Sequence, residues 1–258
     1  MSTTARQAVV GVLGIAVAIL TWQLAATTGP LARSPLPTAT DTITTAASLM
    51  GPAALWSATG ITVIMAFGGL LAAAVVGIGL GAAIGVSPVA MHATRVVLEF
   101  LKPIPPIVIL PIVVLVLGPT LEMGIFLTFF GCVFAIAMQT SAGIFDSDPV
   151  AIATARSYGL GPAEILRRVV LPSATPYIGT SLRVCAPTAL IVAVVAGLLG
   201  GGPGLGQALL LAQLSGDQAA LFAYVLILGV LGLIVQGLSV WAERRALHWH
   251  PQYRKVEH

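Results

Sequence analysis

Long apolar runs with very few charged residues make up most of this 258-residue chain. Hydrophobic residues account for 57% of the sequence, and only 8% of it is Asp, Glu, Lys or Arg, whereas soluble proteins have about 25% charged residues. A helix needs about 20 apolar residues to cross roughly 30 Å of hydrocarbon. We therefore predict an all-α integral membrane protein, embedded in the lipid bilayer, with a single transmembrane domain over residues 1–258.

The apolar runs predict six transmembrane helices, at residues 9–27, 61–86, 104–118, 124–145, 178–199 and 219–241. The third run is short and contains Pro105, Pro106 and Pro111, so it requires a broken or kinked helix whose freed carbonyl groups are covered by neighbouring protein. The first run, between Arg6 and Ala25-Ala26, has two interpretations: a retained helix or a cleaved signal peptide. Its length exceeds the 7–15 apolar residues typical of a signal peptide, which favours the retained helix.

The distribution of Lys and Arg predicts the orientation of the chain. The segments on one side of the predicted spans contain Arg6, Arg95, Lys102, Arg156, Arg167, Arg168, Arg244, Arg245, Arg254 and Lys255. The opposite loops contain one basic residue, Arg33. Because cytoplasmic loops are enriched in Lys and Arg, both termini are predicted to be cytoplasmic. The net charge of +3 is therefore explained by basic residues in the predicted cytoplasmic segments, and we predict no nucleic-acid partner.

The outer connection at residues 29–59 is rich in Pro, Thr and Ala. Thr40 or Asp41 is a candidate N-cap for a short helix that runs through Leu49. With Leu55 and Trp56 following, we expect an interfacial element on the outer surface of the membrane.

Small residues recur at every fourth position of the second predicted span. They are Gly69, Ala73, Gly77, Gly81 and Gly85. At 3.6 residues per turn they form one stripe along a helix, and such a stripe lets another helix backbone approach closely. The pattern predicts tight helix packing. The partner helix belongs either to the same chain, which we favour, or to another copy.

Polar side chains are rare inside the predicted spans, and no Asp or Glu lies in the middle of one. Ion-coupled carriers usually keep ionisable groups there. Gln139 and Gln236 either line a pathway or bond between helices. Arg183 is expected to snorkel or form an ion pair at the membrane interface, with a role in gating as the alternative. Cys132 and Cys185 are expected to be small buried apolar side chains, and we predict no metal and no cofactor.

A polar segment, residues 146–176, separates the fourth and fifth predicted spans. Residues 151–157 read as a short helix, and Gly159 can adopt the positive φ that ends a helix. Pro162 suits the start of a second helix, which is predicted to end at Leu171-Pro172. The segment is either a compact cytoplasmic protrusion or an ordinary solvated loop.

The spacing within this segment is Ala153-x-Ala155-x3-Gly159-x9-Val169-x-Leu171-Pro172. It resembles the cytoplasmic signature of the membrane subunits of bacterial ATP-binding-cassette importers, which reads Glu-Ala-Ala, three residues, Gly, nine residues and Ile-x-Leu-Pro. The sulfonate, taurine and nitrate branch is similar in further stretches. These are Ala-Arg-Ser-Tyr-Gly-Leu at 155–160, Leu-Lys-Pro-Ile-Pro-Pro at 101–106 with Pro111, and the tail, with Glu-Arg-Arg at 243–245 and His-Trp-His-Pro-Gln-Tyr at 248–253.

The resemblance implies a permease subunit in a bacterial inner (plasma) membrane. It implies ATP-binding-cassette ATPase subunits and an extracytoplasmic substrate-binding protein as partners, and a homodimer of permeases. It also implies that a coupling helix contacts the ATPase through Ala153, Thr154, Ala155, Arg156, Ser157, Tyr158, Gly159 and Leu160. The chain has no Gly-x4-Gly-Lys-Ser/Thr phosphate-binding loop, so ATP hydrolysis is expected in a separate subunit and no catalytic residue is predicted.

Departures from the family pattern limit what the resemblance says about the substrate. Ala153 stands where the signature has Glu, and Glu164 is an alternative source of an acidic contact. Val116-Leu117 replaces an aromatic pair, and Ala196-Gly197 stands where relatives carry a Glu. A small anion such as a sulfonate is expected, with nitrate-like anions and vitamin precursors as alternatives. A single-component carrier or channel and a membrane scaffold are the alternative functions.

Overall fold

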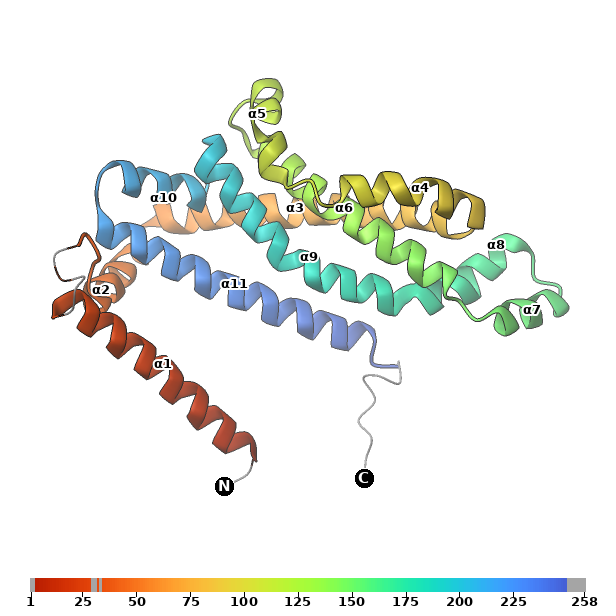
Figure 1. Ribbon diagram of the computed structural model, residues 1–258, viewed down its shortest axis with the longest axis horizontal. Coiled ribbons are helices and arrows are strands. Elements are labelled where there is room, and N and C mark those ends of the chain that lie inside the picture. Colours follow the sequence, from red (N-terminus) through yellow and green to blue (C-terminus); the bar gives the residue numbers. More distant parts are fainter. Residues whose placement is uncertain (1–2, 29–31, 33, 250–258) are drawn as a thin grey trace. The chain divides into compact units, whose positions relative to one another are not determined.

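The computed structural model describes residues 3–28, 32 and 34–249, and every regular element in this part of the chain is a helix (Figure 1). The all-α prediction is therefore confirmed. The elements are α1 (Thr3–Thr27), α2 (Ala39–Leu49), α3 (Ala53–Gly85), α4 (Pro88–Leu101), α5 (Pro106–Leu117), α6 (Leu121–Phe145), α7 (Pro149–Ser157), α8 (Pro162–Ile165), the π-helix η1 (Leu166–Val170), α9 (Leu171–Gly200), α10 (Leu205–Leu214) and α11 (Gln218–Ala246). Arg33 and the predicted tail residues 250–258 lie outside the described residues, as does the side chain of Arg95.

Five helical stretches are long and apolar enough to cross a membrane, and a sixth exists if α4 and α5 together form one span. These two helices meet at an angle of 82°. The predicted third span therefore corresponds to α5 alone, which has 12 residues. The connection between the second and third predicted spans is helical, because Ser87 caps α4 by accepting a hydrogen bond from the Ala90 amide at 3.3 Å. Pro105 then begins the new helix direction as the N-cap of α5.

The described residues divide into two compact units, each built from two separate stretches of the sequence. The first contains α1, α2, the first residues of α3 and residues 208–230. Within it, the Trp22 indole donates a hydrogen bond to the Pro37 carbonyl at 3.1 Å, and its ring centroid lies 6.0 Å from that of Phe222. The N-cap of α2 is Thr38, not Thr40 or Asp41, and its hydroxyl accepts from the Asp41 amide at 3.0 Å. The predicted end of this helix at Leu49 is confirmed.

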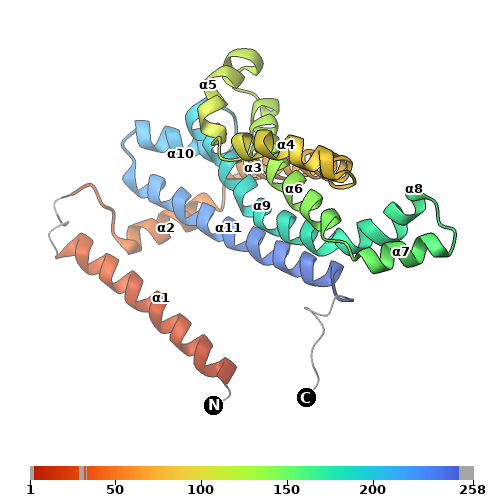
Figure 2. The same cartoon turned by 45° about the vertical axis from the view of Figure 1, so that its right-hand side comes forward.

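The second unit contains residues 58–207 and 231–249, and its centre is the pairing of α6 with α9 (Figures 1 and 2). The core side chains are buried and mostly small. They include Met65, Ala73, Cys132, Ile136, Cys185, Ala189 and Ala193. Both cysteines are free and buried, and the Cys132 thiol lies 3.8 Å from the Cys185 carbonyl oxygen. Small residues at the crossing let the two backbones approach closely, as is common in membrane helix pairs.

The stripe of small residues on α3 lies against α6 of the same chain. A Cβ atom built on Gly69 would lie 2.6 Å from the Ile125 carbonyl oxygen, and one built on Gly81 would lie 2.5 Å from the Ala137 carbonyl oxygen. Gly77 and Gly85 meet α6 at similarly short distances, and Ala73 is fully buried. Any larger side chain on this face would displace the α6 backbone.

Candidate functional site

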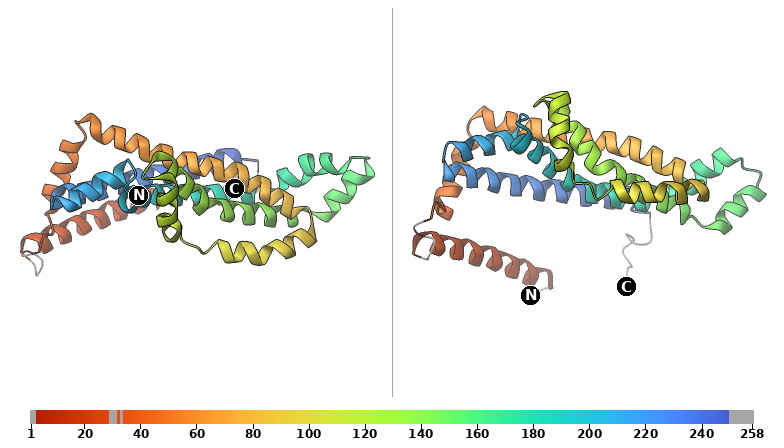
Figure 3. Two further views of the ribbon diagram at one scale, coloured as in Figure 1. Left: turned by 90° about the horizontal axis from the view of Figure 1, so that it is seen from above. Right: turned by 45° about the horizontal axis from the view of Figure 1, so that its top comes forward.

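The polar segment forms a helix, α7, that lies beyond the ends of α6 and α9 together with α8 (Figures 1 and 3). Asp148 begins it: its carboxylate accepts a hydrogen bond from the Val150 amide at 2.8 Å, and Pro149 occupies the first helical position. A capping carboxylate and a proline at this position both stabilise a helix start. Local sequence therefore accounts for where α7 begins.

A Schellman motif ends α7 at the glycine that the spacing singled out. The Gly159 amide donates to the Arg156 carbonyl at 2.9 Å, and the Leu160 amide donates to the Ala155 carbonyl at 3.2 Å. Gly159 has φ +82°, which costs glycine little and strains any other residue. Leu160 and Ala155 also belong to one apolar cluster, which supplies the hydrophobic contact that accompanies this motif.

The two faces of α7 differ in what they contact. Ala155 faces inward and is buried with Ile144, Ile165, Val170 and Ala174. Because these residues come from α6, α8, η1 and α9, α7 is attached to the ends of the central helix pair. A helix capped at both ends and anchored on one face is a rigid element.

The opposite face of α7 is exposed. It presents Ala153, Thr154, Arg156, Ser157, Tyr158 and Gly159. The hydroxyl groups of Thr154 and Ser157 donate to carbonyl groups one turn earlier, at 2.8 and 3.2 Å, so this face is less polar than its composition suggests. Tyr158 is 82% exposed and Val150 is 69% exposed. The sequence interpretation missed Val150, although its position four residues before Thr154 places it on the same side.

The predicted end of the second helix at Leu171-Pro172 is wrong. Helix α8 is followed directly by the π-helix η1 and then by α9, so one helical path runs over Pro162–Gly200. The Leu171 amide donates to the Leu166 carbonyl, five residues back. This wider turn lets the chain pass Pro172, which lacks an amide hydrogen, without a break. Helix α8, which packs against α7 through Ile165 and Ala155, is thus continuous with a helix long enough to cross a membrane.

Glu164 does not offer a free carboxylate beside α7. Its carboxylate lies 3.4 Å from the Arg168 guanidinium, in an exposed ion pair between residues one helical turn apart.

A pocket of about 730 Å³ separates α7 and α8 from the ends of α3 and α6, and Arg156 and Gly159 are among its lining residues. Among the predicted coupling residues, Arg156 therefore supplies a basic side chain at the border of this pocket.

Arg183 forms an ion pair inside the second unit. Its Nε lies 2.8 Å from a carboxylate oxygen of Glu243 on α11, and the Thr180 hydroxyl donates to the other oxygen at 3.0 Å. The Glu243 side chain is 4% exposed and that of Arg183 is 34% exposed. The pair borders a mainly apolar pocket between α3, α9 and α11. Pairing was one of the alternatives for Arg183, and its partner Glu243 could not be identified from the sequence.

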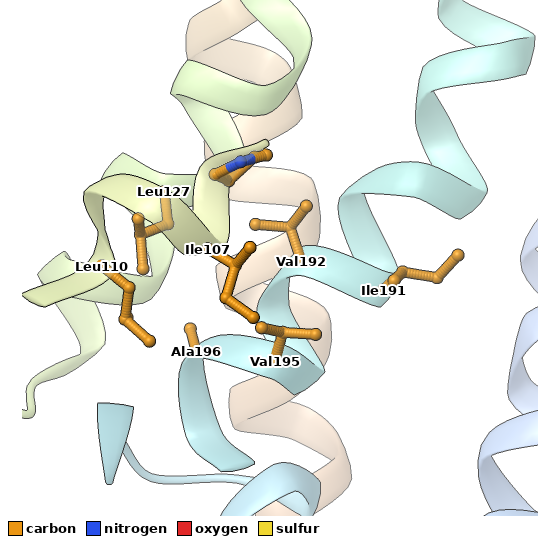
Figure 4. Close-up of a pocket in the computed structure, with 8 residues that line it drawn as sticks. Ile107, Leu110, Leu127, Ile191, Val192, Val195 and Ala196 are labelled. Carbon is orange, nitrogen blue, oxygen red and sulfur yellow. The ribbon is translucent and has the colours of Figure 1, made fainter. Parts of the chain in front are cut away.

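Gln139 and Gln236 are both exposed on their helices, α6 and α11. Neither side chain joins the Arg183 pair, so the structure does not bring the three predicted pathway residues together. Instead, α5, α6 and α9 surround an apolar pocket of about 190 Å³. Figure 4 shows its lining residues, which include Ile107, Leu127 and Val192.

The chain belongs to a known family of membrane proteins. Residues 74–248 match the family described as binding-protein-dependent transport system inner membrane component. This range contains α7 and its attachment to the central helices. The class of protein is therefore a multi-span inner-membrane transport component.

Individual relatives agree with this assignment. A probable ABC transporter permease protein of Brucella melitensis is 30% identical over 151 residues, which cover 58% of this chain and 61% of that protein. The matched part thus spans about three fifths of that relative. The taurine transport system permease protein TauC of Escherichia coli is 29% identical over 95% of this chain and 91% of its own length. Among solved structures, the inward-facing MetNI methionine ABC transporter has a subunit with the same fold, with TM-score 0.65, 21% identity, and coverage of 74% of this chain and 95% of that one.

Proposed function

We propose that this chain is the permease subunit of an ATP-driven importer in a bacterial inner membrane. An ATPase subunit hydrolyses ATP, an extracytoplasmic protein delivers the solute, and the chain forms the translocation pathway with both termini in the cytoplasm. One observation carries the proposal: a chain of this family presents a rigid, exposed helix, α7, beyond its central helix pair. A single-component carrier or channel would need no such docking element.

In this proposal α7 is the coupling helix. The side chains on its exposed face, from Val150 to Tyr158, insert into a groove of the ATPase. Because Ala155 attaches the helix to α6, α8 and α9 through the buried cluster, a displacement of α7 by a few ångströms would move the transmembrane helices with it. A mobile loop would absorb the same displacement.

A second copy of the chain would complete the pathway. Helices α5 and α9 flank the apolar pocket of Figure 4, and both also expose large apolar side chains outside it. Leu115 and Val116 on α5 and Leu199 on α9 are examples, with Leu115 at 85% exposure. Exposed apolar faces of this size contact either lipid or another subunit, and the homodimer is the arrangement that we propose. Gln139 and Gln236 are the polar candidates for contact with solute.

We propose a small anion, such as a sulfonate, as the solute. The similarity to the taurine permease covers nearly the whole chain, and few acidic side chains lie in the spans to repel an anion. A vitamin precursor is the alternative substrate, because Val116-Leu117 and Ala196-Gly197 depart from the family pattern near the proposed pathway.

The proposed role of α7 is tested by Gly159→Val with Gly161→Val as the matched control. A Cβ at either position would meet nothing within 4 Å, and only Gly159 has positive φ, at +82°. Gly161 has φ −73°. We expect Gly159→Val to strain the end of α7, at a cost of about 1–3 kcal/mol, and Gly161→Val to be tolerated.

The measurements are co-purification with the ATPase and substrate-stimulated ATP hydrolysis in vesicles. Gly159→Val should insert into the membrane but lose docking or stimulation, and Gly161→Val should retain both. Arg156→Ala should cause a milder defect, because an exposed charge contributes less than about 1 kcal/mol. Normal docking and normal stimulation in Gly159→Val would exclude α7 as the coupling helix.

A further inference from the structure

The last turns of α11 combine an apolar stripe with a basic cluster on one face. Ile234, Leu238, Trp241 and Arg245 are exposed at helical spacing. The separations of four, three and four residues keep these side chains on one side of the helix. His248 is exposed in the turn that follows the end of α11 at Ala246. A surface that is apolar along one part and basic along the next is chemically complementary to an amphiphile with an anionic head and an apolar tail.

The basic end of this face lies at the depth of lipid headgroups. Helix α11 has 29 residues and is therefore about 43 Å long at a rise of 1.5 Å per residue. The hydrocarbon layer is about 30 Å thick, so roughly nine residues extend beyond it. Asp217 caps the first turn by accepting from the Ala220 amide at 2.9 Å, which marks the polar boundary at that end. Trp241 and the residues after it then lie at the opposite interface, where Trp is enriched.

The basic side chains surround a hollow of about 590 Å³. Its lining residues are Trp241, Arg244, Arg245 and His248. The Arg245 guanidinium carbon lies 5.9 Å from the centroid of the Trp241 ring, a cation–π contact that holds the charge beside the indole. The His248 Nδ1 lies 3.0 Å from the Arg245 carbonyl and keeps the imidazole at the end of the helix.

The positive charge of this cluster is not neutralised by the described residues. The adjacent carboxylate, Glu243, is buried on the other side of α11 and paired with Arg183. Neither Arg244 nor Arg245 forms an ion pair within residues 34–249. Two guanidinium groups without a carboxylate partner among the described residues are suited to a phosphate group, which they bind through several N–H donors.

We propose that this cluster, with Ile234 and Leu238, binds an anionic phospholipid such as phosphatidylglycerol. The phosphodiester contacts Arg244, Arg245 and His248, Trp241 lies at the level of the glycerol, and an acyl chain lies along Ile234 and Leu238. The apolar stripe is what selects a lipid over a free phosphate or an acidic peptide, because neither of those has a long apolar part. The site binds its lipid independently of the proposed transport function.

The test is a lipid titration of the full-length purified protein in detergent, read by native mass spectrometry. Phosphatidylglycerol and phosphatidylcholine with identical acyl chains are compared. A basic side chain near an anionic lipid surface strengthens binding about fivefold, so Arg244→Gln/Arg245→Gln should bind phosphatidylglycerol about 30-fold more weakly. Arg167→Gln/Arg168→Gln removes the same charge from η1 and should bind it as the parent does. Arg244→Lys/Arg245→Lys keeps the charge and should retain most of the affinity.

Three results would overturn the proposal. The first is equal binding of the two lipids by the parent protein, a comparison that requires no folded variant. The second is parental affinity for phosphatidylglycerol in the Arg244→Gln/Arg245→Gln protein. The third is displacement of the lipid by millimolar glycerol 1-phosphate, which would identify a site for free phosphate esters.

Discussion

The buried ion pair between α9 and α11 makes a quantitative prediction about stability. Arg183→Ala would remove the cation that lies 2.8 Å from the Glu243 carboxylate, whose side chain is 4% exposed. The Thr180 hydroxyl would remain as the carboxylate's hydrogen-bond donor, at 3.0 Å. Leaving one partner of a buried pair uncompensated costs about 3–5 kcal/mol. Because Arg183 is itself 34% exposed, the lower end of that range, about 3 kcal/mol, is the expected loss.

The assay is thermal unfolding of the purified protein in detergent, followed by tryptophan fluorescence. For a chain of 150–250 residues, 1 kcal/mol shifts Tm by about 2–4 °C, so Arg183→Ala should lower Tm by about 6–12 °C. The matched control is Arg168→Ala, which breaks the exposed pair with Glu164, whose side chains are 68% and 52% exposed. Such pairs contribute about 0–1 kcal/mol, so this variant should unfold within about 4 °C of the parent.

A double variant separates the loss of the pair from the loss of packing. Arg183→Met/Glu243→Leu removes both charges and keeps apolar volume between the helices, and replacing a buried pair in this way is often neutral or stabilising. We expect it to recover most of the Tm lost in Arg183→Ala. If Arg183→Ala unfolds at the same temperature as Arg168→Ala, the carboxylate is hydrated and the argument from its burial is refuted.

Three further predictions follow from α3, from the proposed orientation and from α7. Gly81→Leu should prevent folding or assembly, because its Cβ would lie 2.5 Å from a carbonyl oxygen of α6 and overpacking costs about 1–3 kcal/mol or more. The control Gly79→Leu, whose Cβ meets nothing within 4 Å, should fold. Equal yields of the two purified proteins would contradict the close packing of α3 on α6. An impermeant maleimide added to intact cells should label Asp217→Cys and not Glu164→Cys, and the reverse pattern would overturn the orientation. Tyr158→Ala should weaken ATPase docking about tenfold or more, as exposed aromatic anchors do, with Tm unchanged; parental docking would remove this ring from the interface.

Several features were predictable from the sequence because they depend on local chemistry. The apolar runs predicted which helices can cross a membrane, and the glycine at 159 predicted where α7 ends. The first follows from the length of uncharged sequence, and the second from the backbone conformation that only glycine adopts without strain. The start of α7 was predicted within two residues, because Asp148 and Pro149 act within one turn of it.

Other predictions of where helices begin and end differ from the structure. Pro172 was expected to end a helix, yet the π-helix before it carries the chain onward. No helix was predicted over residues 88–101, although Ser87 and Pro88 form a recognisable helix start.

Long-range contacts were decided by the tertiary structure alone. The period of four in α3 predicts that Gly69 and Gly81 lie on a packed face, but a period cannot say which helix packs there, and the structure places α6 of the same chain against it. Glu243 follows Thr180 by 63 residues, so the buried ion pair forms only because α9 and α11 lie side by side. The sequence by itself determined which apolar segments are long enough to cross a membrane and where α7 ends, because solvation and backbone conformation act residue by residue. The tertiary structure determined which faces meet, because packing depends on residues that are distant along the chain.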